Sequence, residues 1–129
     1  MPVVIGFIPT AEGRAALESG IAEAQRRSSR AEVMVHATRG SEPSDLDAAV
    51  TEASELLERA GVDFGVHKLE RGGDIADDLI HLAESTQAAM IVIGLRRRSP
   101  VGKLILGSNA QRILLDAPCP VLAVKPHPR

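Results

Sequence analysis

Aromatic side chains and cysteine are scarce in this sequence of 129 residues, which has two Phe, no Trp, no Tyr and one cysteine, Cys119. Proteins that bind single-stranded nucleic acid commonly stack the bases on aromatic rings, so we expect no nucleic-acid partner. Cys119 can form no internal disulfide, and the N-terminal residues lack the charged, apolar and small-residue order of a secretory signal. We therefore expect the protein in a reducing cytoplasm.

Long apolar runs and an excess of one charge are missing as well. The apolar runs are only a few residues long, far short of the roughly 20 that span a bilayer, so we expect no membrane segment. The net charge of -2 gives no general attraction to nucleic acid or anionic lipid. The four histidines are scattered without metal-ligand spacing, and no metal site is expected. A hydrophobic content of 44% fits one domain, residues 1–129.

Two kinds of apolar pattern alternate along the chain. Short apolar or alternating runs, typical of strands, occur at 3–8, 31–37, 62–69, 90–93 and 121–124. Apolar residues recur at helical spacing in 11–27, 44–61, the segment that follows Asp74, and 108–115. Thr10 and Asp74 are placed to cap helices. The predicted order of elements is βαβαβαβαβ.

This alternation of strands and helices predicts the fold class. Strands separated by helices pair in parallel through right-handed crossovers. We therefore expect an α/β protein, a three-layer α/β/α sandwich with a doubly wound, Rossmann-like, five-stranded parallel sheet. In such folds ligands bind outside the carboxyl ends of the strands, near the point where the strand order reverses. The strand ends concerned are Ile8, Ala37 and Gly94.

The segment from Gly94 to Asn109 is the most informative part of the sequence. It leaves an apolar strand and ends at a helix N-terminus, where unpaired N–H groups and roughly half a positive charge favour an anion. The glycines, polar side chains and cations that a phosphate could use are Gly94, Gly107, Ser108, Asn109, Arg96 and Arg97. Taken one by one, the same residues also suit two turns, an ordinary helix cap and a solvated basic loop.

Two common phosphate-binding patterns are absent. A Walker loop needs Ser or Thr after Gly102-Lys103, but Leu104 follows, and Arg97 stands where its first glycine would fall. The first strand leads into Ile8-Pro9-Thr10 without the G-x-G-x-x-G of dinucleotide-binding folds.

The order of these features resembles that of the universal stress protein family over essentially the whole chain. The resemblance rests on I-V-I-G at 91–94, L-G-S at 106–108 and A-P-C-P-V-L at 117–122. It implies the strand order 3-2-1-4-5 and a stress-response protein with a regulatory adenine nucleotide, ATP or a relative, with Mg²⁺ if the ligand is ATP.

The resemblance also implies a set of nucleotide-binding residues at three strand ends and one helix start. They are Gly6, Phe7, Ile8, Ala37, Ile93, Gly94, Arg96, Arg97, Gly107, Ser108 and Asn109. In that arrangement Ile8 and Ala37 line the base pocket, and the loop with its glycines holds the phosphates.

Two positions depart from the pattern of nucleotide-binding family members. Arg97 replaces the second glycine of the loop, where its guanidinium either fills the site or binds phosphate. Ile8 replaces an Asp that would accept a hydrogen bond from the ribose. The alternative function is therefore a nucleotide-independent dimeric protein that acts through protein–protein contacts.

The resemblance further implies a homodimer formed by edge-to-edge pairing of the last strand, Val121, Leu122, Ala123 and Val124. Besides a second copy and an adenine nucleotide, a protein partner of unknown identity is expected. Catalysis, such as slow ATP hydrolysis, has the least support, because the sequence offers no identifiable general base and no dedicated magnesium carboxylate.

Overall fold

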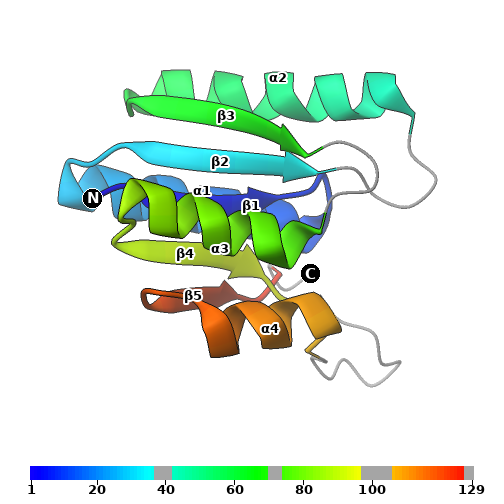
Figure 1. Cartoon of the computed structure of the whole chain (residues 1–129). Coiled ribbons are helices and arrows are strands. Elements are labelled where there is room, and N and C mark those ends of the chain that lie inside the picture. The colour runs from blue at the N-terminus through cyan, green and yellow to red at the C-terminus, as the bar shows by residue number, and fades with distance from the viewer. Residues whose placement is uncertain (37–41, 70–73, 97–105, 127–129) are drawn as a thin grey trace.

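The computed structural model covers the chain and describes residues 1–36, 42–69, 74–96 and 106–126 (Figure 1). The elements are β1 (Val3–Phe7), α1 (Ala11–Arg27), β2 (Ala31–His36), α2 (Pro43–Ala60), β3 (Phe64–Leu69), α3 (Ile75–Thr86), β4 (Met90–Gly94), α4 (Ser108–Asp116) and β5 (Val121–Val124). The predicted order of elements is confirmed. None of the described helices is both long and apolar enough to cross a lipid bilayer.

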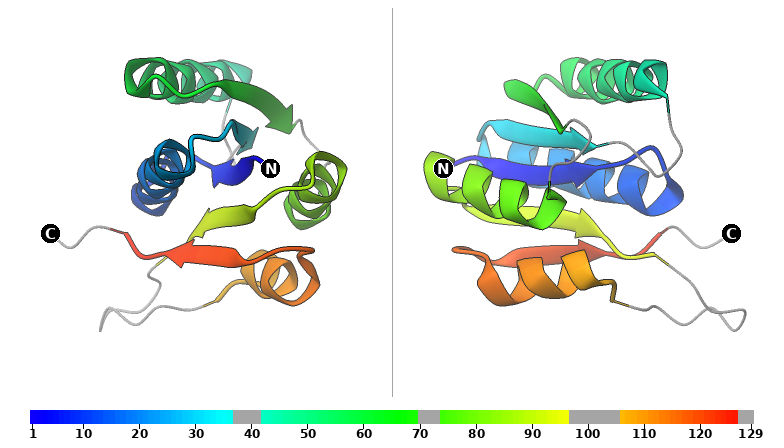
Figure 2. Two further views of the ribbon diagram at one scale, coloured as in Figure 1. Left: turned by 90° about the vertical axis from the view of Figure 1, so that its left-hand side faces the viewer. Right: turned by 45° about the vertical axis from the view of Figure 1, so that its right-hand side comes forward.

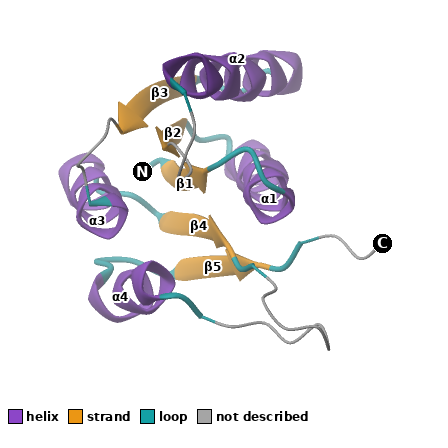
Figure 3. Ribbon diagram, turned by 90° about the vertical axis from the view of Figure 1, so that its right-hand side faces the viewer, coloured by secondary structure: helices purple, strands orange, loops and turns teal. Residues whose placement is uncertain are grey.

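The five strands form one parallel sheet in the order β3-β2-β1-β4-β5. β1 lies in the middle, between β2 and β4, so the chain moves outward to one edge first and then to the other. Helices α1 and α2 cover one face of the sheet, and α3 and α4 cover the other (Figure 3). The predicted three-layer, doubly wound architecture is confirmed.

Two apolar cores result, one on each face of the sheet. Val3, Ile5 and Phe7 of β1 point into the core beneath α1 and α2, where Leu17 and Leu57 are fully buried. Val4 and Ile91 point to the other side, against Leu79 of α3 and Ile113 of α4. The central strands are thus apolar on both faces, which explains why they appear in the sequence as continuous apolar runs.

Several element boundaries differ by a few residues from the sequence expectation. β1 ends at Phe7, because the carbonyl of Ile8 turns to accept from the Thr10 N–H at 2.8 Å. α2 begins at Pro43 instead of Ser44, with Glu42 as N-cap in a capping box closed by Asp45. Pro43 suits the first helical position, where its missing N–H costs nothing. β3 begins at Phe64, two residues later than expected.

Candidate functional site

The carboxyl ends of the strands and the N-termini of the helices meet at one edge of the molecule, which we call the carboxyl edge (Figures 1 and 3). Because β1 pairs with both β2 and β4, the strand order reverses between β1 and β4 at this edge. Parallel α/β sheets bind their ligands at such a point. We therefore take the carboxyl edge at β1, β4 and α4 as the candidate site.

The start of α1 forms one wall of this site. Thr10 caps the helix, with its hydroxyl accepting from the Gly13 N–H at 3.1 Å. The turn is so tight that a Cβ on Gly13 would lie 1.9 Å from the carbonyl oxygen of Ile8. The backbone of Ile8, a half-buried residue at the exit of β1, thus packs directly on the first turn of α1.

The end of β4 packs directly on the same helix turn. A Cβ on Gly94 would lie 2.3 Å from the carbonyl oxygen of Glu12 in the first turn of α1. The next residue, Leu95, still donates its N–H to the carbonyl of Val124 at 2.8 Å. Gly94 therefore allows β4 and α1 to approach each other, and it determines where the chain leaves the sheet.

The N-terminus of α4 is open, unlike the other helix starts. Side chains of Thr10 and Asp74 accept from first-turn N–H groups of α1 and α3, and Asp45 closes a capping box with Glu42 at the start of α2. Gly107, the N-cap of α4, offers no such bond, and a Cβ built on it meets nothing within 4 Å among the described residues. Among the described residues, therefore, no side chain caps the first turn of α4, which is the condition that an anion-binding helix start requires.

The predicted site residues divide into three groups. Phe7 and Ile93 have side chains buried in opposite cores, so only their backbone is near the edge, and Gly6 lies inside β1 against Leu79. At the edge itself Ile8 and Gly94 are half-buried, and four further residues are exposed: Arg96, Gly107, Ser108 and Asn109. Ala37 and Arg97 lie outside the described residues.

Sequence reasoning missed two residues that shape this edge. Gly13 was treated only as part of a helix, although a glycine in a first helical turn costs up to about 1 kcal/mol and signals close backbone contact. Arg112 of α4 was not singled out. It forms ion pairs with Asp74 and Asp77 at the start of α3, 38 residues away for Asp74. No local pattern in the sequence indicates that contact.

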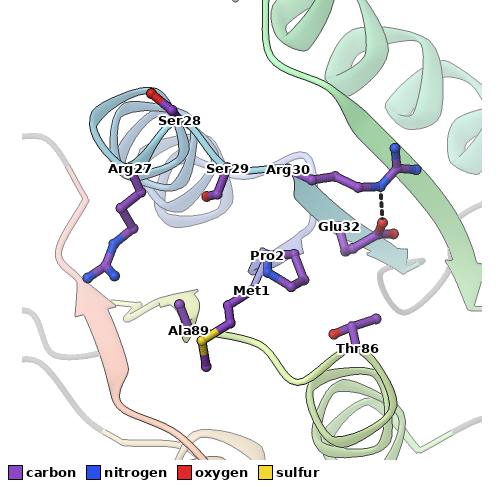
Figure 4. Close-up of a pocket in the computed structure, with 9 residues that line it drawn as sticks. All are labelled: Met1, Pro2, Arg27, Ser28, Ser29, Arg30, Glu32, Thr86 and Ala89. Atoms are coloured by element: carbon purple, nitrogen blue, oxygen red, sulfur yellow. Dashed lines mark hydrogen bonds and ion pairs between the residues drawn. The ribbon is translucent and has the colours of Figure 1, made fainter.

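An ionic cluster centred on the buried Glu32 of β2 lies apart from the candidate site and includes Arg30 as well as His67 of β3. Glu32, only 7% exposed, accepts from Arg30 Nε and from His67 Nε2, the latter at 2.6 Å. Burial by itself would raise the pKa of Glu32, but hydrogen bonds from His67 and Arg30 and their charges outweigh it, and the pKa is lowered. The cluster borders an open hollow of about 650 Å³ near the amino ends of the strands (Figure 4).

That hollow is at the opposite edge from the candidate site. It is lined by Met1 and Pro2, by the end of α1 and by Thr86 and Ala89 near the start of β4. Within the described ranges, no three His, Cys, Asp or Glu side chains group in a way that could hold a metal ion.

Comparison with known proteins identifies relatives over nearly the whole chain. A model of the universal stress protein family matches residues 1–125. The chain belongs to the universal stress protein family. A universal stress protein of Mycolicibacterium smegmatis is 42% identical over 131 residues, which cover 97% of this chain and 98% of that protein.

Solved members of the family share the fold. A universal stress protein from Archaeoglobus fulgidus superposes with a TM-score of 0.81 at 30% identity, over 97% of this chain and 98% of its own. A structure of the universal stress protein from the same organism in complex with dAMP gives a TM-score of 0.77 at 25% identity, with the same coverage. The predicted fold and family are both confirmed.

Proposed function

We propose that this protein binds an adenine nucleotide as a regulatory ligand at the carboxyl edge, with the phosphates at the N-terminus of α4. The observation that carries the proposal is the open first turn of α4, headed by Gly107, beside the reversal of strand order between β1 and β4. The dAMP complex of the Archaeoglobus relative supports it, since that protein has the same fold.

Each part of the nucleotide has a matching feature in the chain. The phosphates would accept from the first-turn N–H groups of α4 and from Ser108 and Asn109, with exposed Arg96 nearby in sequence. Half-buried Ile8 offers an apolar surface to the base. If the ligand is ATP, Mg²⁺ would be held mainly through the phosphates, because the described residues provide no cluster of three acidic or histidine ligands.

Titration calorimetry with AMP and with ATP, with and without magnesium, tests the proposal. We expect saturable binding to the wild type and a raised thermal midpoint in the presence of ligand. Gly107→Asp should abolish binding, because the new carboxylate would cap α4 and repel the phosphates, while raising stability by about 0.5–1 kcal/mol.

Gly107→Ala is the matched control for this variant. Its Cβ meets none of the described residues within 4 Å and brings neither a cap nor a charge, so most of the affinity should remain. If the wild type shows no heat and no thermal stabilisation at millimolar nucleotide, the proposal is wrong.

A second candidate is a nucleotide-independent family member that acts through protein contacts. The observation that favours it is Ile8, which stands at the exit of β1 where nucleotide-binding members have an Asp for the ribose. The calorimetry separates the two candidates directly. Release of phosphate from ATP well above background would instead indicate an enzyme.

We also propose a cytoplasmic homodimer that pairs through β5. This strand is at the edge of the sheet, with α4 beside it (Figure 2). Its four residues are all half-buried, and Leu115 of α4 is 83% exposed. An apolar edge strand flanked by exposed leucines is expected to be covered by a partner.

A further inference from the structure

Arg112 connects the starts of the two helices on the α3/α4 face of the sheet. Its Nη1 atom lies 3.0 Å from Asp74 Oδ2, and its Nη2 atom forms an ion pair with Asp77 Oδ1. Asp74 is also the N-cap of α3 and accepts from the Asp77 N–H at 3.1 Å. One guanidinium thus holds two carboxylates that crowd the N-terminus of the neighbouring helix.

These carboxylates are close to the place where phosphates would bind. Arg112 is one turn after Ser108 in α4, about 6 Å along the helix axis, and side chains on a helix lean toward its N-terminus. Because Asp74 and Asp77 contact the end of that side chain, we take their carboxylates to lie on the order of 10 Å from the α4 start. At that distance an unscreened carboxylate repels an approaching phosphate.

We infer that Arg112 screens the phosphate site from Asp74 and Asp77, and so favours nucleotides that carry more phosphates. This inference rests on the proposed nucleotide site. With Arg112 the local formal charge of the three residues is about −1, and without it about −2. Since AMP carries about two negative charges and ATP about four, loss of Arg112 weakens ATP binding more than AMP binding.

The test compares the affinities of AMP and ATP in magnesium-free buffer at low salt, for the wild type and Arg112→Gln. We expect about fourfold weaker binding of AMP and about tenfold or more for ATP, because each charge pair at about 10 Å in water contributes about a factor of two. In about 0.5 M KCl both losses should shrink to within about twofold.

Two further variants separate charge screening from other roles of Arg112. Arg112→Lys keeps the charge and should bind like the wild type. Asp74→Asn and Asp77→Asn combined with Arg112→Gln should restore ATP affinity at least to the wild-type level, since Asn still caps α3. Arg59→Gln is the matched control, since it removes the same charge from an exposed pair with Glu55 in the last turn of α2.

The possible outcomes are distinct. If Arg112→Gln binds AMP and ATP with the same affinities as Arg59→Gln, the screening role of Arg112 is wrong, whereas the proposed nucleotide site is unaffected. If Arg112→Gln loses affinity that the Asn substitutions do not restore, Arg112 contacts the ligand itself and screening is again wrong. If the wild type binds neither nucleotide at millimolar concentration, the proposed function fails and the inference with it.

Discussion

At the scale of single residues, Glu32 provides the clearest link between structure and pH. Its carboxylate is nearly buried and accepts hydrogen bonds from Arg30 and His67, which keep its pKa below the ordinary value of 4.5. A lowered folded-state pKa means that the ionised group stabilises the fold above pH of about 4.5, and that this contribution is lost as the pH falls through the lowered pKa. Glu32→Gln should therefore cost about 1–3 kcal/mol at pH 7 and progressively less below pH of about 4.5.

Urea denaturation of wild type and variant between pH 3 and pH 7, a range of about four units, measures this difference. Glu52→Gln is the control, because its ion pair with Arg14 is solvent-accessible and contributes only about 0–1 kcal/mol. A cost of Glu32→Gln that stays constant down to pH of about 3 would contradict the explanation.

At the scale of secondary-structure elements, the candidate site depends on how closely β4 approaches α1. Gly94→Ala would place a Cβ 2.3 Å from the carbonyl oxygen of Glu12, and because that oxygen belongs to backbone, the strand and the helix must separate. We expect a loss of about 1–3 kcal/mol in the free energy of unfolding, measured by urea denaturation.

Gly6→Ala in β1 is the matched comparison. The closest contact of its Cβ would be the tip of the Leu79 side chain, at 3.1 Å, which can move aside by a few tenths of an ångström. The variant should therefore be clearly more stable than Gly94→Ala. Equal costs for the two substitutions would show that the contact between Gly94 and α1 does not limit the packing.

At the scale of the whole molecule, the fold was predictable because it rests on local and periodic signals. Apolar runs predict the buried strands, and Thr10 and Asp74 cap the helices that they were expected to cap. The contacts that shape the edge were not predictable in this way. Gly94 meets Glu12, and Arg112 meets Asp74, across large separations in sequence. In the sequence, Glu32 and His67 are ordinary polar positions of two strands, and nothing local shows that they face each other.

The hydrogen-bond pattern of β5 allows a test of the proposed homodimer. The carbonyl of Pro120 accepts from the N–H of Ile91 in β4, and the carbonyl of Val124 accepts from the N–H of Leu95 just after β4. Since residues of a strand alternate in direction, Val121 and Ala123 turn their N–H groups to the free edge. Ala123→Pro would remove one N–H donor from the free edge and no hydrogen bond to β4. Edge strands tolerate proline at such positions, where the N–H faces outward.

We expect the wild type to have the mass of a dimer in light scattering after size exclusion, and Ala123→Pro to have that of a monomer with a similar fold. Ala123→Ser keeps the N–H and should remain dimeric. The N–H of Leu122 faces β4, so Leu122→Pro should instead lower the free energy of unfolding by about 3 kcal/mol or more. If the Ala123→Pro protein is still a dimer, the interface lies elsewhere, and exposed Leu115 on α4 is the next residue to substitute. If the wild type is a monomer, the proposed homodimer is wrong.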